Sequence, residues 1–210
     1  GFRHFGFCGF SNHDWSRRRL LGFQRALMTA GRECTVLQSE WDTFGSHSWD
    51  EQQDAIGRWL TQLPKPVGVM AAHDLRALCV LDACRRMSIA VPEQVAIVGV
   101  DDDEVLCRLA DPPLSSVPHD LERIGTEAAS LLGRLMQGEP PPQEPLLVGP
   151  LSVVARRSTD SVAIADPQVA SAMRFIREHA CRGIRVEDVA VQAGLSRRAL
   201  ERAFATQLGI

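Results

Sequence analysis

Acidic side chains follow two apolar segments of the chain, at positions where a sheet would bind a ligand. Asp74 comes shortly after the apolar run Val67–Ala72, and three acids, Asp101–Asp103, follow the apolar run Val95–Val100. Ionised carboxylates accept strong, charge-assisted hydrogen bonds. In open α/β sheets, ligands bind beyond the carboxyl ends of the strands. If both runs are strands, these acids therefore mark the ligand edge of a sheet.

A second group of polar side chains lies near the end of the sequence, where RVEDVAVQAGLSRRALERAF has the pattern of a helix-turn-helix. Gly194 suits the tight turn, and Ser196 can cap the helix that follows. The side chains expected to face outward on that helix are Arg197, Arg198, Glu201 and Arg202. Arginine binds both phosphates and guanine edges, which favours DNA as a partner. The alternative is a small helical hairpin with a solvated arginine face.

The elements that would position these residues alternate between strand and helix. Short apolar runs predict strands over residues 3–10, 35–37, 67–72 and 95–100, with helices between them. Repetition of this order predicts a doubly wound, mostly parallel α/β sheet. Asn12 or Asp14 can cap the first helix, and Asp74 can cap the helix after the third strand.

The segment after the sheet contains one more predicted helix and strand. Asp120 can cap a helix that runs to about Gly138. Residues 146–155 predict a last strand, edge-like because it contains Pro150. The polar run 156–160 reads as part of a linker. We therefore expect an α/β domain over residues 1–158, a linker over 159–166, and a small all-α segment over 167–210.

Composition is that of an ordinary globular chain, with 210 residues and a net charge of −3. The charge is uneven: residues 166–210 carry seven Arg against five acids, whereas residues 1–165 carry 16 basic and 21 acidic residues. Six scattered cysteines predict reduced thiols, with a metal or disulfides as the alternative. The histidines lack zinc-site spacing. No run is long enough to span a membrane, and no signal peptide is visible.

One stretch of the sequence resembles the ligand-binding domain of lac-repressor-family regulators and their periplasmic sugar-binding relatives. This stretch contains, in order, an apolar strand, a polar residue followed by Asp, a helix and the run VPEQVAIVGVDD. The resemblance implies a sugar bound between two lobes. Residues 1–115 and 146–158 resemble one lobe, and 116–138 resemble the crossover to the other. Because the chain starts at Gly1 inside a predicted strand, we expect a fragment. The apolar stripe of its helix 120–138 would then be exposed or buried against a neighbour.

The same resemblance implies four sugar-binding residues. Arg19, in the run RLLGF, and Asp101, which closes VGVD, match the family's sugar-binding Arg and Asp. His73 stands where the family usually has Asn, and His119 where it usually has Gln; both keep hydrogen-bonding capacity in a different shape. The alternative for Arg19 is an ordinary surface arginine, and the alternative for Asp101 is an acid at the start of the next helix. His73 and His119 could instead be histidines of the core or of loops. Trp41 and Trp49 lie near this edge, as packing residues or as a face for the sugar.

The C-terminal segment, including AMRFIREHACRGI, resembles the first helix-turn-helix of AraC/XylS-family activators. That resemblance implies phosphate contacts by Ser196 and Arg197 and base contacts by Arg198, Glu201 and Arg202. Family members carry two such motifs, and only one lies in this sequence. A sugar domain followed by an AraC-type domain resembles the xylose-operon regulators, over essentially all 210 residues.

These observations predict a cytoplasmic, homodimeric transcription regulator that binds double-stranded DNA and senses a pentose such as D-xylose to control a sugar-catabolism operon. No membrane partner, cofactor, metal or catalytic residue is expected. A sugar-binding transport component is the alternative. An enzyme is disfavoured because the sequence contains neither a nucleophile elbow nor a phosphate loop.

Overall fold

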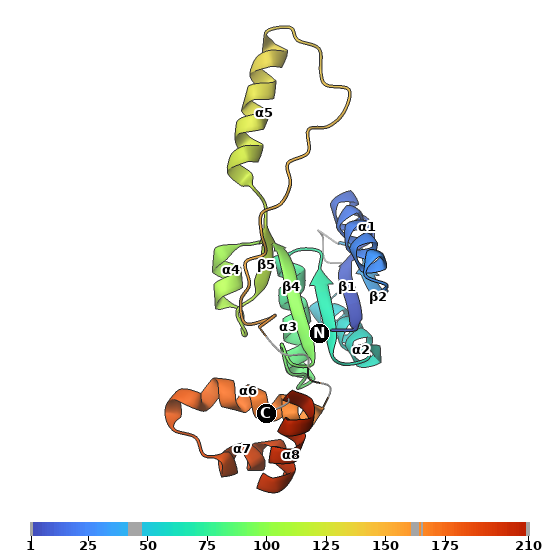
Figure 1. Ribbon diagram of the computed structural model, residues 1–210. Coiled ribbons are helices and arrows are strands. Elements are labelled where there is room, and N and C mark those ends of the chain that lie inside the picture. Colours follow the sequence, from blue (N-terminus) through green and yellow to red (C-terminus); the bar gives the residue numbers. More distant parts are fainter. Residues whose placement is uncertain (1, 42–47, 161–163, 165, 209–210) are drawn as a thin grey trace.

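Five parallel strands form the centre of the molecule, in the order β2-β1-β3-β4-β5 (Figure 1). The computed structural model describes residues 2–41, 48–160, 164 and 166–208. The strands are β1 (His4–Phe10), β2 (Cys34–Ser39), β3 (Val67–Ala71), β4 (Val95–Asp101) and β5 (Ser115–Pro118). The predicted α/β fold with a parallel sheet is thus confirmed.

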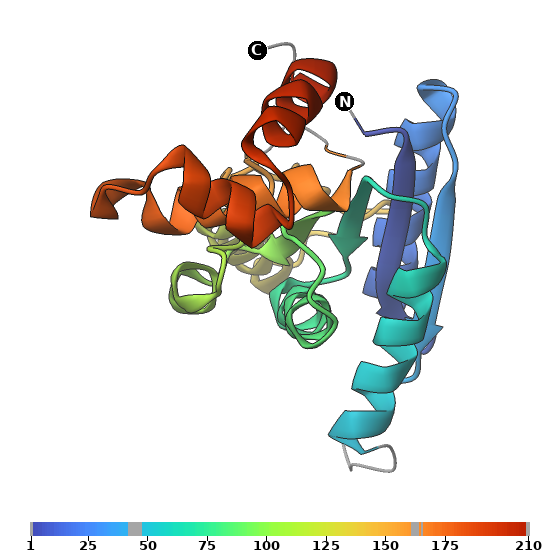
Figure 2. The same cartoon turned by 90° about the horizontal axis from the view of Figure 1, so that it is seen from below.

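Helices lie on both faces of this sheet. They are α1 (Asp14–Thr29), α2 (Trp49–Gln62), α3 (Asp74–Arg86) and the short α4 (Glu104–Leu109). Neighbouring residues of β1 point to opposite faces: Phe7 packs with α1, and Cys8 packs in the core shared with α2 and α3. Both side chains are fully buried. The apolar runs are continuous because the strands are covered on both sides; Figure 2 shows α1 and α2 beside β1.

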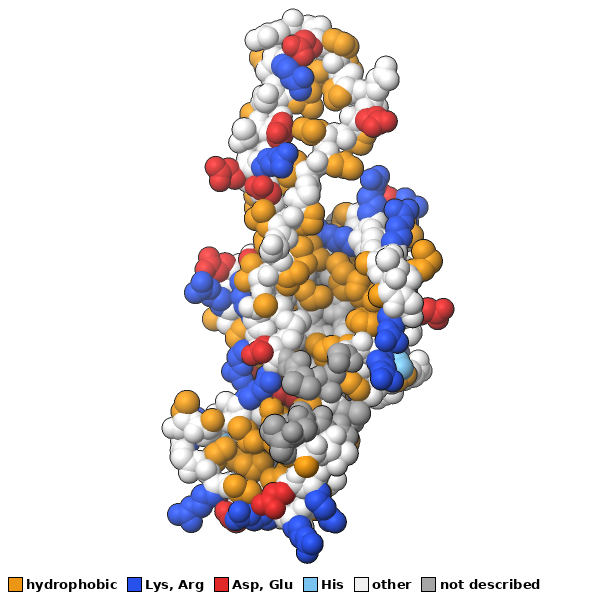
Figure 3. Space-filling model, viewed as in Figure 1, with side chains coloured by type: hydrophobic (Ala, Val, Ile, Leu, Met, Phe, Trp, Pro, Cys, Tyr) orange, Lys and Arg blue, Asp and Glu red, His pale blue; other side chains and the backbone are white. Residues whose placement is uncertain are grey.

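The helix α5 (Leu121–Met136) and the coil after it extend away from the carboxyl end of the sheet (Figure 1). Asp120 caps α5 as predicted, by accepting a hydrogen bond from the Arg123 amide. None of the residues of α5 is buried, and its apolar side chains are exposed together with those of the coil (Figure 3). The exposed ones are Leu121, Ile124, Leu132, Leu135, Met136, Leu146, Leu147, Leu151 and Val153.

The predicted strand over residues 146–155 is wrong. The segment is coil and makes one antiparallel bridge, between Ser116 and Val154, besides a hydrogen bond from the Leu151 amide to the Pro118 carbonyl. The strand β5, beside which this segment lies, has only four residues, and Pro150 has no amide hydrogen to donate. The segment therefore lacks a partner long enough for a ladder.

Three helices form a unit at the opposite, amino end of the sheet (Figure 1). They are α6 (Pro167–His179), α7 (Val186–Ala193) and α8 (Arg197–Leu208), with a 3-10 turn (Ala180–Arg182) after α6. We call α6–α8 the three-helix unit, and residues 2–160 the α/β lobe. Asp166 caps α6 ahead of Pro167, and Gly194 has a positive φ of 65° at the turn between α7 and α8.

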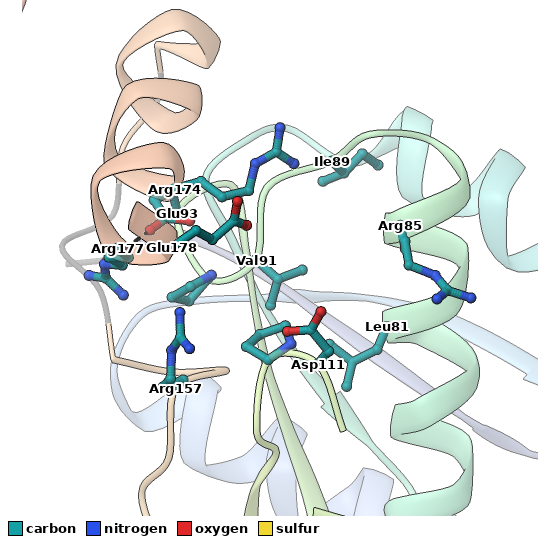
Figure 4. Close-up of a pocket in the computed structure, with 12 residues that line it drawn as sticks. Leu81, Arg85, Ile89, Val91, Glu93, Asp111, Arg157, Arg174, Arg177 and Glu178 are labelled. Carbon is teal, nitrogen blue, oxygen red and sulfur yellow. Dashed lines mark ion pairs between the residues drawn. The ribbon is translucent and has the colours of Figure 1, made fainter. Parts of the chain in front are cut away.

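The three-helix unit is packed against the α/β lobe through a small apolar core that we call the junction core. It consists of the buried residues Ala90, Ile164, Val169 and Ala170. The Ile164 amide also donates to the Glu93 carbonyl in the loop between α3 and β4. A hollow beside this contact is lined by charged side chains from both parts, including Glu93, Arg157, Arg174 and Arg177 (Figure 4).

Two local expectations are corrected by the structure. Neither Asn12 nor Asp14 caps α1, whose N-cap is His13 without a side-chain hydrogen bond; Asn12 instead bonds the Trp41 backbone. Asp74 is not the cap of α3, because the His73 ring accepts from the Arg76 amide. In the polar run 156–160, Ser158 is fully buried and hydrogen-bonded to β4.

Candidate functional site

Three of the four predicted sugar-binding side chains meet beyond the carboxyl ends of the strands. Arg19 reaches from α1, Asp101 ends β4, and His119 follows β5. The Arg19 Nη2 lies 3.1 Å from Asp101 Oδ1 and 2.9 Å from His119 Nε2. His119 Nε2 lies 3.0 Å from the same Asp101 oxygen. These residues are 82 and 18 positions apart in sequence from Asp101, and only the fold brings them together.

This cluster leaves one polar contact unsatisfied whichever way the histidine is protonated. If His119 Nε2 has no hydrogen, it accepts from Arg19 and faces the Asp101 oxygen without a bond; if it has one, it donates to Asp101 and cannot accept from Arg19. A hydroxyl can donate and accept at once. A ligand hydroxyl placed here can therefore accept from Arg19 and donate to Asp101. Asp101 is 44% exposed and His119 34%, so both can reach a ligand.

His73 lies beside this cluster in a more buried position. Its Nδ1 accepts from the Arg76 amide at 2.9 Å, so a neutral ring carries its hydrogen on Nε2. That Nε2 is buried and has no hydrogen-bond partner among the described residues. Burial lowers the pKa of His73, and the nearby charges change this less. The lowered pKa favours the neutral ring, whose Nε2 hydrogen is a buried donor without a partner among the described residues.

Aromatic side chains surround His73. The Trp15 ring stacks on it with centroids 5.4 Å apart, and Phe10 and Trp41 lie edge-on at 5.4 and 5.1 Å. The Arg19 guanidinium lies over the Trp15 ring at 5.1 Å. Trp41 thus belongs to the site, whereas Trp49 begins α2 and is 53% exposed. Trp15 was missed because it reads as an ordinary residue in the first turn of a helix.

Asp74 has a role that the sequence did not reveal. Its carboxylate is buried and accepts from the Asp103 amide at 2.8 Å and the Ser116 hydroxyl at 2.6 Å. It thereby ties the ends of β4 and β5 to the start of α3. Gly99 permits this arrangement, because a Cβ at that position would collide with the Asp74 carboxylate. The partners lie 29 and 42 positions away, so no local pattern could have found them.

Arg76 was also missed. It is buried, donates to the Ser39 hydroxyl at 3.0 Å, and places its guanidinium 4.9 Å from the Phe10 ring centroid. A hollow beside the start of α3 is lined by Phe10, Trp41, His73 and Arg76. The sequence alone could not identify Arg76 as a site residue, because its burial and its contact with the Phe10 ring depend on the fold.

The predicted DNA-contacting side chains all lie on or just before α8, and all five are exposed: Ser196, Arg197, Arg198, Glu201 and Arg202. Ser196 caps α8 by accepting from the Ala199 amide. Arg197 is paired with Glu187 and Glu201, each at 3.0 Å. Hydrogen bonds from Arg197 to Glu201 and Glu187 raise the pKa of the guanidinium. Arg198 and Arg202 have no ion-pair partner within the described ranges, so they remain available.

The three-helix unit has its own core of Ala172, Val189, Ala190, Ala193 and Leu200. Lys and Arg side chains gather at the outer end of this unit, far from the carboxyl edge of the sheet (Figure 3). All six cysteines are free, and only Cys181 is exposed. Across the described ranges, no His, Cys, Asp or Glu side chains group as metal ligands, and no helix is long and apolar enough to cross a bilayer.

Comparison with known proteins adds family evidence. The family model of the periplasmic binding protein-like domain matches residues 1–159. The xylose operon regulatory protein of Escherichia coli (strain K12) is 36% identical over 212 residues, which covers 100% of this chain and 54% of that protein. The chain thus spans about half the length of that curated relative.

Two solved structures of transcription regulators are also similar to this chain. The structure of the xylose-binding transcription activator xylR superposes with a TM-score of 0.85 and 35% identity, over 99% of this chain and 55% of that one. The cellobiose complex of the transcriptional regulator CelR has a TM-score of 0.61 and 29% identity, over 75% of this chain and 47% of its own.

Proposed function

Since the chain belongs to the periplasmic binding protein-like family, matched over residues 1–159, we propose that it is part of a sugar-responsive transcription regulator. The ligand is a pentose such as D-xylose, and the regulated genes serve sugar catabolism. The regulator works as a homodimer on double-stranded DNA, in the cytoplasm. The domains are the lobe over residues 1–158, the linker 159–166 and the partial DNA-binding unit 167–210.

The observation that carries the sugar assignment is the meeting of Arg19, Asp101 and His119 at the carboxyl edge of the sheet. A guanidinium offers a fork of donors and a carboxylate two acceptor oxygens, which suits vicinal hydroxyls. His73 adds a free donor, and the nearby indoles offer an apolar face for the carbon side of a sugar. The names of the relatives support xylose in particular.

The DNA assignment rests on α7, the turn at Gly194 and α8, with the exposed face of Arg197, Arg198, Glu201 and Arg202. The relative whose name refers to the xylose operon aligns with this region as well as with the lobe. Arg198 and Arg202 are the better candidates for base contacts, because Arg197 is held by two glutamates. Ser196, as the α8 cap, is suited to a backbone phosphate.

The sugar site and the arginine face lie beyond opposite ends of the sheet (Figures 1 and 3). A sugar therefore cannot touch DNA, and it acts only through unequal affinity for two arrangements of the protein. We propose that closure of the lobes on the sugar changes how the paired DNA-binding units are presented.

The test is a fluorescence-anisotropy titration of cognate promoter DNA with the full-length protein, with and without D-xylose and a panel of other sugars. We expect xylose to tighten DNA binding. Arg202→Gln should weaken DNA binding by about 1–3 kcal/mol if Arg202 contacts a base, while D-xylose affinity, measured by calorimetry, stays the same. Arg25→Gln, on the exposed side of α1, is the matched control.

Two other results would change the proposal. If no sugar affects DNA binding, the protein is still a transcription regulator, but D-xylose is not supported as its ligand. Sugar binding without salt-sensitive DNA binding would favour a sugar-binding transport component instead.

A further inference from the structure

The turn that presents Asp101 has an unusual backbone. Asp101 has φ 110° and Asp102 has φ 56°, so two consecutive residues other than glycine lie in the left-handed region. Such conformations are disfavoured for residues that have a Cβ, and they persist only where the surroundings impose them. The conformation directs the Asp101 carboxylate toward Arg19 and His119. Something in the structure must therefore hold this turn.

An ion pair lies directly beneath the turn. Arg156 Nη1 is 2.7 Å from Asp102 Oδ1, and the two side chains are only 15% and 17% exposed. The same nitrogen donates to the Leu114 carbonyl at 2.9 Å, and the Arg156 amide donates to the Ser115 hydroxyl at 2.7 Å. Burial by itself lowers the pKa of Arg156, but the hydrogen bond and charge of Asp102 outweigh it, so the pKa is raised.

The backbone of the turn is fixed as well. The Asp102 amide donates to the Ser116 hydroxyl at 3.1 Å, and that hydroxyl donates to Asp74. The next amide, of Asp103, also donates to Asp74. These bonds fix the two amides after Asp101, but the Asp102 side chain is fixed only by Arg156 among the described residues.

We propose that the Asp102–Arg156 ion pair is the positioning element of the sugar site, holding the left-handed turn that presents Asp101 to the ligand. This inference rests on the proposed function, in which Asp101 accepts sugar hydroxyls. Asp102 and Arg156 act through the backbone and do not contact the sugar. Arg156 also begins the segment that leads past the buried Ser158 toward α6.

The test uses the full-length protein and D-xylose as the probe. We expect Arg156→Gln and Asp102→Ala each to weaken D-xylose binding about tenfold, the scale of one strained residue. Asp102→Gly should bind several-fold more tightly than Asp102→Ala, since glycine takes a positive φ without a steric penalty. In the Asp102→Gly background, Arg156→Gln should cost nothing further.

The matched control is Asp82→Asn, which removes a carboxylate paired with Arg85 at the same 2.7 Å but on the outer part of α3. It should leave D-xylose affinity unchanged. Melting temperatures of all variants separate a loss of affinity from a loss of stability. If Asp102→Gly binds no better than Asp102→Ala, Asp102 acts on the ligand through its own carboxylate and the inference is wrong.

A second readout does not depend on any sugar. Arg156→Gln should speed hydrogen exchange of the Asp102 and Asp103 amides, measured by NMR, relative to the Asp82→Asn control. Unchanged exchange at both amides overturns the inference. If the unmodified protein binds no sugar while exchange is faster, the proposed function fails and the positioning role of the ion pair stands.

Discussion

At the scale of residues, the sugar-site cluster cannot satisfy all of its own hydrogen bonds, because His119 Nε2 can either accept from Arg19 or donate to Asp101 but cannot do both. In the proposed function, a sugar hydroxyl accepts from Arg19 and donates to Asp101. Replacing Asp101 by Asn keeps a residue that tolerates positive φ but removes the charge. A hydrogen bond to a charged group is worth about 1.5–3 kcal/mol. We therefore expect Asp101→Asn to weaken D-xylose binding about 10–100-fold by calorimetry. The nearby exposed acid Glu104 provides the control, and equal losses in Glu104→Gln would contradict a specific role for Asp101.

His73 combines two tasks that substitution can separate. An Asn side chain can cap α3 and still donate, so His73→Asn should keep its stability and most of its D-xylose affinity. His73→Ala loses the cap, which costs about 1 kcal/mol, and also the buried Nε2 donor, for which we propose a ligand hydroxyl as partner. Denaturant unfolding and calorimetry measure the two effects. Full sugar affinity in His73→Ala would show that the free Nε2 has no ligand.

The pH dependence of this residue has a definite sign. Because burial lowers the pKa of folded His73, the unfolded chain takes up a proton first as the pH falls through about 6.5. Stability supplied by the neutral ring is thus present above that pH and is lost below it. Between pH 7.5 and 5.5, the unmodified protein should lose more stability than His73→Asn.

At the scale of elements, the sequence predicted the parallel sheet because each central strand is an apolar run with a helix after it. The strand ends also placed Asp101 at the ligand edge, whereas Arg19 and His119 were expected there only because of the family resemblance. The sequence could not predict the hydrogen bonds of Asp74, because its partners Ser116 and Asp103 are distant in sequence.

The contact between α6 and the lobe contains a buried charge. Glu93 is 1% exposed, and Arg177 Nε lies 3.4 Å from its Oε1. Neither Glu93 oxygen has a hydrogen-bond partner in the part of the chain that is described, so the geometry is that of an ion pair without a hydrogen bond. Burial raises the pKa of Glu93, and the charges of Arg177, Arg174 and Arg157 offset this only in part.

An acid whose pKa is raised on folding favours the folded state at low pH, and that contribution is lost as the pH rises through the folded pKa. We therefore expect Glu93→Gln to be more stable than the unmodified protein at pH 7.5, by about 1 kcal/mol, and equal to it well below the usual Glu pKa of about 4.3. Arg177→Gln should destabilise at pH 7.5, because it leaves the carboxylate unpaired. Thermal melts across this range measure both; a less stable Glu93→Gln at neutral pH would show that the ion pair outweighs burial.

At the scale of the whole molecule, the proposed response to sugar requires that the three-helix unit be attached firmly to the lobe. The attachment is made by the loop before β4, where Ala90 packs in the junction core and the Glu93 carbonyl accepts from the amide of Ile164, a residue between the lobe and α6. Ile164 is 1% exposed, so it is built into the junction core although it lies in the predicted linker. If the unit is held firmly, a movement of the lobe moves the arginine face of α8 with it.

Ile164→Ala should therefore loosen the attachment without touching either site. Truncating a buried Ile costs about 2–5 kcal/mol of packing, here confined to the junction core. We expect D-xylose affinity to be retained, and the factor by which D-xylose tightens DNA binding to fall toward one. By linkage, the factor by which DNA tightens sugar binding must fall equally. Leu78→Ala, at a partly buried position packed against the lobe's own core, is the control for lost packing alone. A full sugar response in Ile164→Ala would mean that the signal passes by a route other than the junction core.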